Sequence, residues 1–234
     1  MCDCRTNSQI SSQTTTLDLQ TLLEKNKHWA ATVSSEQPAF FSRLLKQQNP
    51  QFLWIGCSDS RVPANVMLEM EPGEIFVHRN IANIVAPSDL NCLSVIQFAV
   101  EQLKVKHIMV VGHTLCSGVR AALLKKRVGL ADSWLRYVQD VADRHKEFLE
   151  QIKDSTIKHN ALCELNALEQ ALHVCQTVTV MDAWAAGQEI HVHALVYALD
   201  NGVMKDLHFS VSAHEQIQPA YERALQLFAQ RYAL

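Results

Sequence analysis

The chain lacks any apolar run of roughly 18 residues, the length that a membrane-spanning helix needs, so no transmembrane segment is predicted. It also has no excess of positive charge, because 21 Lys and Arg stand against 24 Asp and Glu and the formal net charge is −3. Proteins that bind nucleic acid usually carry a basic stripe or patch, so this balance argues against a nucleic-acid partner. No basic patch followed by an apolar stretch opens the sequence, and no signal peptide is predicted.

A disulfide framework is missing as well. The seven cysteines are odd in number and irregular in spacing, which is not the pattern of a disulfide-bonded secreted domain. Free thiols are typical of a reducing compartment, so a cytoplasmic location is predicted. Cys2 and Cys4 lie in a polar tail, where they could bind metal adventitiously or oxidise, but a tail residue more often has no specific role.

The size of the chain predicts one domain. Its 234 residues, of which 48% are hydrophobic, are enough for one sizeable core and few for two domains. Residues 1–16 are rich in Ser, Thr and Gln, so we expect a flexible N-terminal extension. No repeat or interdomain linker interrupts the rest, and residues 17–234 are predicted to form a single α/β domain.

Apolar runs that alternate with helical patterns predict a parallel sheet. The runs that predict strands are 52–56, 74–78, 107–111 and 190–199. The hairpin signal Asn201-Gly202 predicts that a fifth strand, 205–211, runs antiparallel at the sheet edge. The fold class is therefore α/β, with a mainly parallel central sheet of four strands, an antiparallel fifth edge strand and flanking helices. The helices are expected at 17–32, 39–47, 63–70, 91–103, 117–127, 134–152 (long and exposed), 160–174, 180–186 and 215–232.

Metal-binding side chains follow two of these strands. Cys57 ends the first apolar run, and His113 ends the third and is followed by Cys116. The carboxyl ends of parallel strands are where open α/β sheets place their sites. Two thiolates, one imidazole and the carboxylate of Asp59 would suit a tetrahedral zinc ion. Asp59 could instead pair with Arg61, and a switchable fourth position is typical of a catalytic site; the alternative for each cysteine is a small buried hydrophobe.

Four segments resemble the β-class carbonic anhydrases. The segments are Cys57-Ser58-Asp59-Ser60-Arg61-Val62-Pro63, the H-x-x-C of His113 to Cys116, the block from Glu71 to Asn80, and Leu162-Cys163-Glu164-Leu165-Asn166. The likeness covers roughly residues 17–215, and it extends to a bicarbonate-regulated, bacterial-type subset of the family. It implies reversible hydration of carbon dioxide to bicarbonate and a proton.

The resemblance implies one Zn²⁺ per chain, bound by Cys57, His113 and Cys116, with a zinc-bound hydroxide as the nucleophile. Zinc can lower the pKa of a bound water from 15.7 to about 7, which agrees with this chemistry. Asp59 and Arg61 would form a supporting dyad, in which the carboxylate accepts a hydrogen bond from the hydroxide and orients it. The alternative for Arg61 is an ordinary surface ion pair, worth about 0–1 kcal/mol.

The resemblance also assigns a substrate pocket. Gln48, nine residues before the first zinc cysteine, matches the family's substrate-orienting amide, although it could be a solvated loop glutamine. Phe76, Phe98 and Gly118 match positions around the carbon dioxide pocket. In the family some pocket residues come from the neighbouring subunit, which implies a homodimer or homotetramer with carbon dioxide and bicarbonate as its small-molecule partners.

A second, regulatory bicarbonate site is implied by Trp54, Arg79 and Tyr197. In the subset that carries them, bicarbonate near Arg79 parts Asp59 from Arg61, and Asp59 then replaces the zinc-bound water. Low pH should favour this inactive state. The alternatives are a core side chain for Trp54 and a structural ion pair for Arg79.

Three positions depart from the family pattern. Ser117 stands where glycine is normal, and it would be strained if that position required positive φ but harmless at a helix start. Leu195 and Ala198 replace a bulkier residue and a glycine near Tyr197, which affects the shape of the bicarbonate pocket more than the zinc chemistry.

Three other functions remain open from the sequence. They are a carbon disulfide hydrolase of the same fold, a zinc and bicarbonate sensor without turnover, and a purely structural zinc protein. His191 and His193 are two apart on a strand and are expected to face the same side, but no role is assigned to them.

Overall fold

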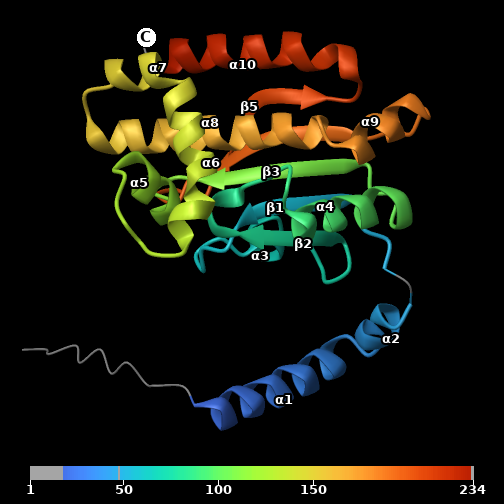
Figure 1. The fold of residues 1–234 in the computed structure, drawn as a ribbon. Helices are drawn as coiled ribbons and strands as arrows, with labels where there is room; N and C mark the ends of the chain where they lie inside the picture. The colour runs from blue at the N-terminus through green and yellow to red at the C-terminus, as the bar shows by residue number, and fades with distance from the viewer. Residues whose placement is uncertain (1–17, 47, 233–234) are drawn as a thin grey trace, which may run out of the picture. The chain divides into compact units, whose positions relative to one another are not determined.

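The computed structural model describes residues 18–46 and 48–232 (Figure 1). The predicted extension with Cys2 and Cys4 lies outside the described residues. Contacts divide the chain after Gln47 into two units, each of which is considered by itself. The first contains α1 (Leu19–Glu36), which Asp18 caps, and α2 (Phe40–Leu44). None of the residues of α1 is buried within the described chain.

The second unit is built on a five-stranded sheet with the order β2-β1-β3-β4-β5. The strands are β1 (Phe52–Cys57), β2 (Ile75–Asn80), β3 (His107–His113), β4 (His191–Tyr197) and β5 (Met204–Val211). The first four are parallel, and β5 pairs antiparallel with β4 after the predicted hairpin turn. The predicted fold class is confirmed. Because β1 and β3 are parallel neighbours, Cys57 and His113 lie at the same end of the sheet.

Most helices of the second unit pack on one face of the sheet. The main core joins that face to α4, α8, α9 and α10, and α3 packs on the opposite face (Figure 1). The helices are α3 (Ala64–Met67), η1 (Ile81–Asn83), α4 (Leu90–Gln97), η2 (Phe98–Gln102, a π-helix), α5 (Ser117–Leu123), α6 (Ala131–Arg144), α7 (Lys146–Gln151), α8 (Ser155–Cys175), α9 (Val178–Ala185), η3 (His214–Gln216) and α10 (Ile217–Arg231). No helix among the described residues is long and apolar enough to cross a membrane.

The prediction of one long exposed helix over 134–152 is wrong. Two helices, α6 and α7, meet at His145, and α6 buries Leu135, Val138 and Val141. The break is stabilised by a distant contact, because His145 Nε2 lies 2.7 Å from Oε1 of the buried Glu169 in α8. The exposed side of α6 carries many charged residues, and because of them the sequence suggested an exposed helix although α6 has a buried apolar stripe.

Three histidine rings stack on the face of the sheet that carries α3. His107 lies 5.2 Å from His191 and 5.3 Å from His193 between ring centroids, so the predicted common side of His191 and His193 is confirmed. His193 Nδ1 also lies 2.6 Å from Oγ of Ser210 in β5. Burial, followed by the charges of His107 and His191, lowers the pKa of His193 to about 4.

This cluster predicts a stability that depends on pH. The unfolded chain protonates His193 below pH 6.5, whereas the folded chain does so only near pH 4, so the free energy of unfolding rises with pH across this interval. The rise due to His193 should be about 2 kcal/mol after a discount for partial exposure. Urea unfolding of a His193→Gln variant should show a flatter pH profile than the wild type. His28→Gln, on exposed α1, is the control, and equal slopes in all three proteins would contradict the prediction.

Candidate metal centre

Three buried donor atoms meet beyond the ends of β1 and β3. Cys57 ends β1, His113 ends β3, and Cys116 caps the N-terminus of α5. Their ligand atoms all lie within 4.8 Å of one another, and the side chains are 5%, 1% and 2% exposed. The two Sγ atoms are 3.8 Å apart. Two sulfurs bound to one tetrahedral zinc ion at about 2.3 Å would lie about 3.8 Å apart, so this spacing fits the metal.

The histidine is oriented as a metal ligand. His113 Nδ1 lies 2.9 Å from the carbonyl oxygen of Thr114 and therefore carries the proton that is donated to it. In the neutral ring the lone pair is then on Nε2, and this buried atom has no hydrogen-bond partner among the described residues. An orphaned buried nitrogen is unfavourable unless a ligand such as a metal ion completes it.

The loop after β2 orients the first cysteine. The backbone N–H of Ala82 donates to Cys57 Sγ at 3.4 Å, and Ala82 adopts a φ of 65°. The carbonyl oxygen of Ala82 accepts a 2.8 Å hydrogen bond from Nδ2 of the buried Asn166, which itself accepts from Gln170. Sequence reasoning assigned no role to these three residues. The available signal was the pair of amides, four apart, inside the apolar stripe of α8.

The thiols perturb one another. The S–H of Cys116, then His113 and the N–H of Ala82, lower the pKa of Cys57 to about 4 against the opposing effect of burial. The same hydrogen bond to Cys57 and burial raise the pKa of Cys116. The opposite directions of the two pKa shifts favour one thiolate beside one thiol, and a cation that binds both sulfurs would displace the remaining proton.

Asp59 and Arg61 form the predicted pair. Arg61 Nε donates to Asp59 Oδ1 at 2.9 Å and Nη2 donates to Oδ2 at 2.7 Å, with the Arg61 backbone N–H also donating to Oδ1 at 3.0 Å. These bonds hold the pKa of Asp59 well below its usual range. Oδ2 also lies 3.8 Å from Nε2 of His113. The carboxylate therefore lies between the guanidinium and the cluster of metal donors.

Arg79 holds the segment that carries these groups. Its Nε donates to the carbonyl oxygen of Cys57 at 2.8 Å and its Nη2 to that of Asp59 at 2.5 Å. Arg79 has no ion pair with a carboxylate in the described part of the chain, so the alternative of a structural ion pair does not hold there. Its place beside Gly56 in the β1–β2 register explains this reach.

The comparisons with known proteins agree with this geometry. The family described as Carbonic anhydrase matches residues 52–204. A carbonic anhydrase of Emericella nidulans is 44% identical over 186 residues, which are 80% of this chain and 82% of that protein. A β-carbonic anhydrase of Coccomyxa, solved in complex with acetazolamide, has a TM-score of 0.82 and 34% identity over 91% of this chain and 98% of that one. The chain belongs to the β-class carbonic anhydrases.

Carbonic anhydrases of this class are zinc enzymes that hydrate carbon dioxide, and zinc is the cofactor that the donor cluster fits. Another relative is one of two tetrameric β-carbonic anhydrases from Sordaria macrospora, with a TM-score of 0.78 and 38% identity over 82% of this chain and 98% of that one.

Two residues of the expected bicarbonate site share one side of this carbonic anhydrase's sheet. Trp54 and Tyr197 pack in one apolar cluster, and Trp54 is fully buried, as its core alternative predicted. Its Nε1 has no partner among the residues described, so an indole N–H is left available for an acceptor. The indole lies over Gly56, where a Cβ would be 2.1 Å from Nε1, so this position excludes any larger residue unless the tryptophan moves.

Two of the four expected substrate-pocket residues contact each other within the described chain. Phe76 and Phe98 stack on each other with ring centroids 6.0 Å apart, and Phe98 is 47% exposed. Gly118 instead packs against η1, where a Cβ would lie 2.8 Å from Cγ2 of Ile81. Gln48 is exposed and forms no hydrogen bond with any described residue.

Ser117 is not strained. It is the first residue of α5, and its φ is not positive. The harmless alternative for this departure from the family pattern is therefore the one that the backbone supports.

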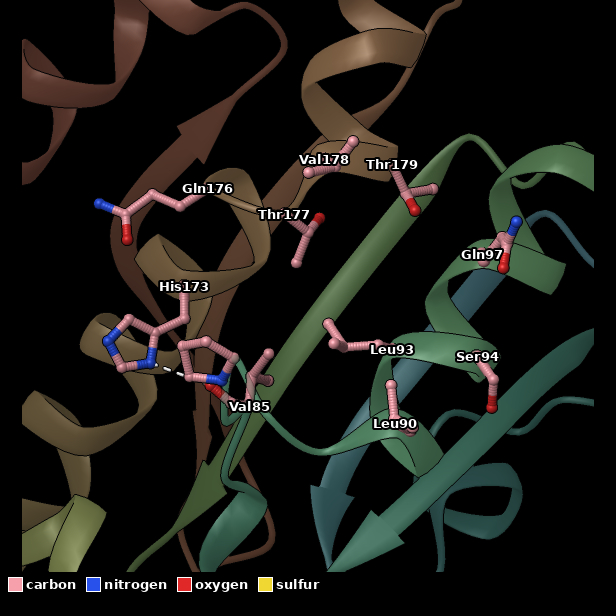
Figure 2. A pocket seen from close by; sticks show the side chains of 11 residues that line it. Val85, Leu90, Leu93, Ser94, Gln97, His173, Gln176, Thr177, Val178 and Thr179 are labelled. Atoms are coloured by element: carbon pink, nitrogen blue, oxygen red, sulfur yellow. Dashed lines mark hydrogen bonds between the residues drawn. The ribbon is translucent and has the colours of Figure 1, made fainter.

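The carbonic anhydrase has a second group of possible metal ligands and a cavity, and neither includes a residue of the metal centre. His78, Asp89 and Cys92 also bring ligand atoms within 4.8 Å of one another. Burial raises the pKa of Cys92 to about 12, and His78 Nε2 already faces Nδ2 of Asn80 at 3.3 Å, so this group is a poorer metal site. A cavity of about 450 Å³ lies between α4 and the α8–α9 turn, and none of the expected site residues lines it. Figure 2 shows the side chains around this cavity.

Proposed function

We propose that this enzyme interconverts carbon dioxide and bicarbonate at a zinc ion held by Cys57, His113 and Cys116. The observation that carries the proposal is the buried Nε2 of His113, which has no partner among the described residues and lies beside two sulfurs 3.8 Å apart. Two thiolates balance the charge of Zn²⁺, which favours a neutral centre in a buried place.

When bound, zinc supplies a hydroxide nucleophile near neutral pH, because coordination strongly lowers the pKa of water. Asp59 would orient that nucleophile by accepting its hydrogen. The two-pronged bond from Arg61 leaves Asp59 ionised and acceptor-only, and it fixes the direction of the free lone pairs. The segment from Cys57 to Asp59 is in turn kept in place by Arg79.

Gln48, Phe76, Phe98 and Gly118 would bind carbon dioxide. The exposure of Gln48 and Phe98 supports a pocket that is completed by a second subunit. The tetrameric relatives of Sordaria macrospora support the same idea, so we propose a homodimer or homotetramer.

A cytoplasmic location and a single domain over residues 17–234, after an N-terminal extension at residues 1–16, are also proposed. The five cysteines within the described chain are all free thiols, which supports a reducing compartment.

The finer proposal is a bicarbonate switch. Bicarbonate would accept the N–H of Trp54, which has no partner in the described part of the chain. It would also draw Arg79 away from the carbonyl oxygens of Cys57 and Asp59, with Tyr197 as a further contact. The segment would then loosen, and Asp59 would leave Arg61 for the fourth ligand position. The 3.8 Å between Asp59 Oδ2 and His113 Nε2 supports so short a movement. Low pH would favour the inactive state.

Stopped-flow carbon dioxide hydration on zinc-quantified protein, at about pH 7 and about pH 8.5 with and without bicarbonate, tests both proposals. The rate should rise with pH and fall with bicarbonate. A Trp54→Phe variant should need about three- to tenfold more bicarbonate for the same inhibition, since one hydrogen bond to the anion is lost. Trp29→Phe, on α1, is the matched control.

Each other outcome has a meaning. Activity without bicarbonate sensitivity would keep the enzyme and remove the switch, and equal sensitivity in all three proteins would remove Trp54 from the bicarbonate site. One zinc per chain without activity would favour the carbon disulfide hydrolase or the sensor, and turnover of carbon disulfide would separate these two.

A further inference from the structure

A hollow of about 600 Å³ lies between α5 and the start of α8. It is separate from the cavity between α4 and α9. Its apolar side is formed by Leu115, Leu123 and Leu124, and the remaining lining residues are polar. The latter are Arg120, Lys153, Ser155, Thr156, Lys158 and His159.

The hollow concentrates positive charge on a chain whose net charge is negative. Arg120, Lys153 and Lys158 form no ion pair with any residue in 18–46 or 48–232, and no carboxylate is among the lining residues. Asp154 is the nearest acidic residue in the sequence, but its Oδ1 accepts the N–H groups of Thr156 and Ile157 as the cap of α8. Lys158 also lines a neighbouring hollow together with Asp143 and Glu150, neither of which forms an ion pair with it. Three cations that face one space without an anion are a ready binding site for one.

A buried imidazole completes the wall. His159 is 5% exposed, and its Nε2 lies 2.8 Å from the carbonyl oxygen of Cys116, so Nε2 carries the proton that is donated. Nδ1 is then the acceptor in the neutral ring and has no partner within the described chain. This lone pair can accept an O–H from a ligand, as a hydroxyl group of a sugar or a protonated phosphate would offer.

We propose that this hollow binds a small organic phosphate. The phosphate group would meet Arg120, Lys153 and Lys158, with the hydroxyls of Ser155 and Thr156 as additional donors. Three cations suit a dianion better than a monoanion such as bicarbonate. A volume of 600 Å³ exceeds the needs of inorganic phosphate, and the leucine side of the hollow offers contact for a carbon skeleton.

Isothermal titration of the zinc-loaded, full-length enzyme with glucose 6-phosphate and, separately, with inorganic phosphate tests the proposal. Glucose 6-phosphate should bind more tightly than phosphate. The double variant Lys153→Gln/Lys158→Gln should bind it at least about tenfold more weakly, because two charge-assisted bonds are removed. Lys125→Gln/Lys126→Gln is the matched control, since it removes the same charge from neighbouring residues that do not line this hollow and should change affinity less than about twofold.

Three outcomes would overturn the proposal. They are no heat from the wild type up to about 10 mM ligand, equal affinity in all three proteins as expected for an anion at the zinc centre, and equal weakening in both double variants as expected for general charge attraction. The readout is binding alone, so failure here leaves the proposed carbon dioxide hydration untouched.

Discussion

A Cys57→Ser protein is expected to lose nearly all of its zinc and to hydrate carbon dioxide at least about 10³-fold more slowly in kcat/KM than the wild type. Serine keeps the size of the side chain, but its hydroxyl is a far weaker zinc ligand than a thiolate. The remaining donors, His113 and Cys116, cannot by themselves hold the ion in a closed tetrahedral set. Zinc per chain by elemental analysis and stopped-flow rates on the same sample measure the two effects.

Cys92→Ser is the matched control for this substitution. Cys92 is as well buried as Cys57, but burial raises the pKa of its thiol and it lies in α4. The control should keep one zinc per chain and near wild-type rates even if it lowers stability. A Cys57→Ser protein that retains both zinc and activity would show that the catalytic ion is held elsewhere.

Much of the metal centre could be predicted because it depends on local sequence. Cys57 and His113 each end an apolar run, and parallel neighbours bring such ends together whatever surrounds them. Arg61 is only two residues from Asp59 in the sequence, so a single turn of the backbone is enough to bring their side chains together.

The parts that sequence reasoning missed depend on long-range contacts. The hydrogen bond from Asn166 to Ala82 joins residues 84 apart, and nothing near Ala82 in the sequence indicates that its N–H points at a sulfur. The same holds for Arg79, whose carbonyl partners lie at the end of β1 and just after it, and for the break between α6 and α7 at His145. The local sequence pattern is enough to predict the metal-binding residues, whereas the residues that orient them are set by tertiary packing.

An Asp59→Asn protein is expected to keep its zinc but to lose about 10²- to 10³-fold in kcat/KM, and Arg61→Lys about 10- to 10²-fold. Asparagine can no longer accept both guanidinium bonds as an anion, and its amide N–H₂ offers a donor where an acceptor is needed. Lysine keeps the positive charge but not the two-pronged geometry. Zinc content and stopped-flow rates at about pH 7 and about pH 8.5 check both variants.

The pH dependence of these variants shows whether Arg61 acts by orienting the Asp59 carboxylate or by keeping it ionised. Arg61 holds the pKa of Asp59 below its usual range, so Asp59 is ionised at every pH where the enzyme is assayed. Loss of the guanidinium lets this pKa rise toward an ordinary carboxyl value, which is still far below pH 7. The loss in Arg61→Lys should therefore be the same at both pH values, because the carboxylate is misaimed rather than protonated. A loss that disappears at the higher pH would mean that Arg61 acts by keeping Asp59 charged, and the orienting role of the pair would then be wrong.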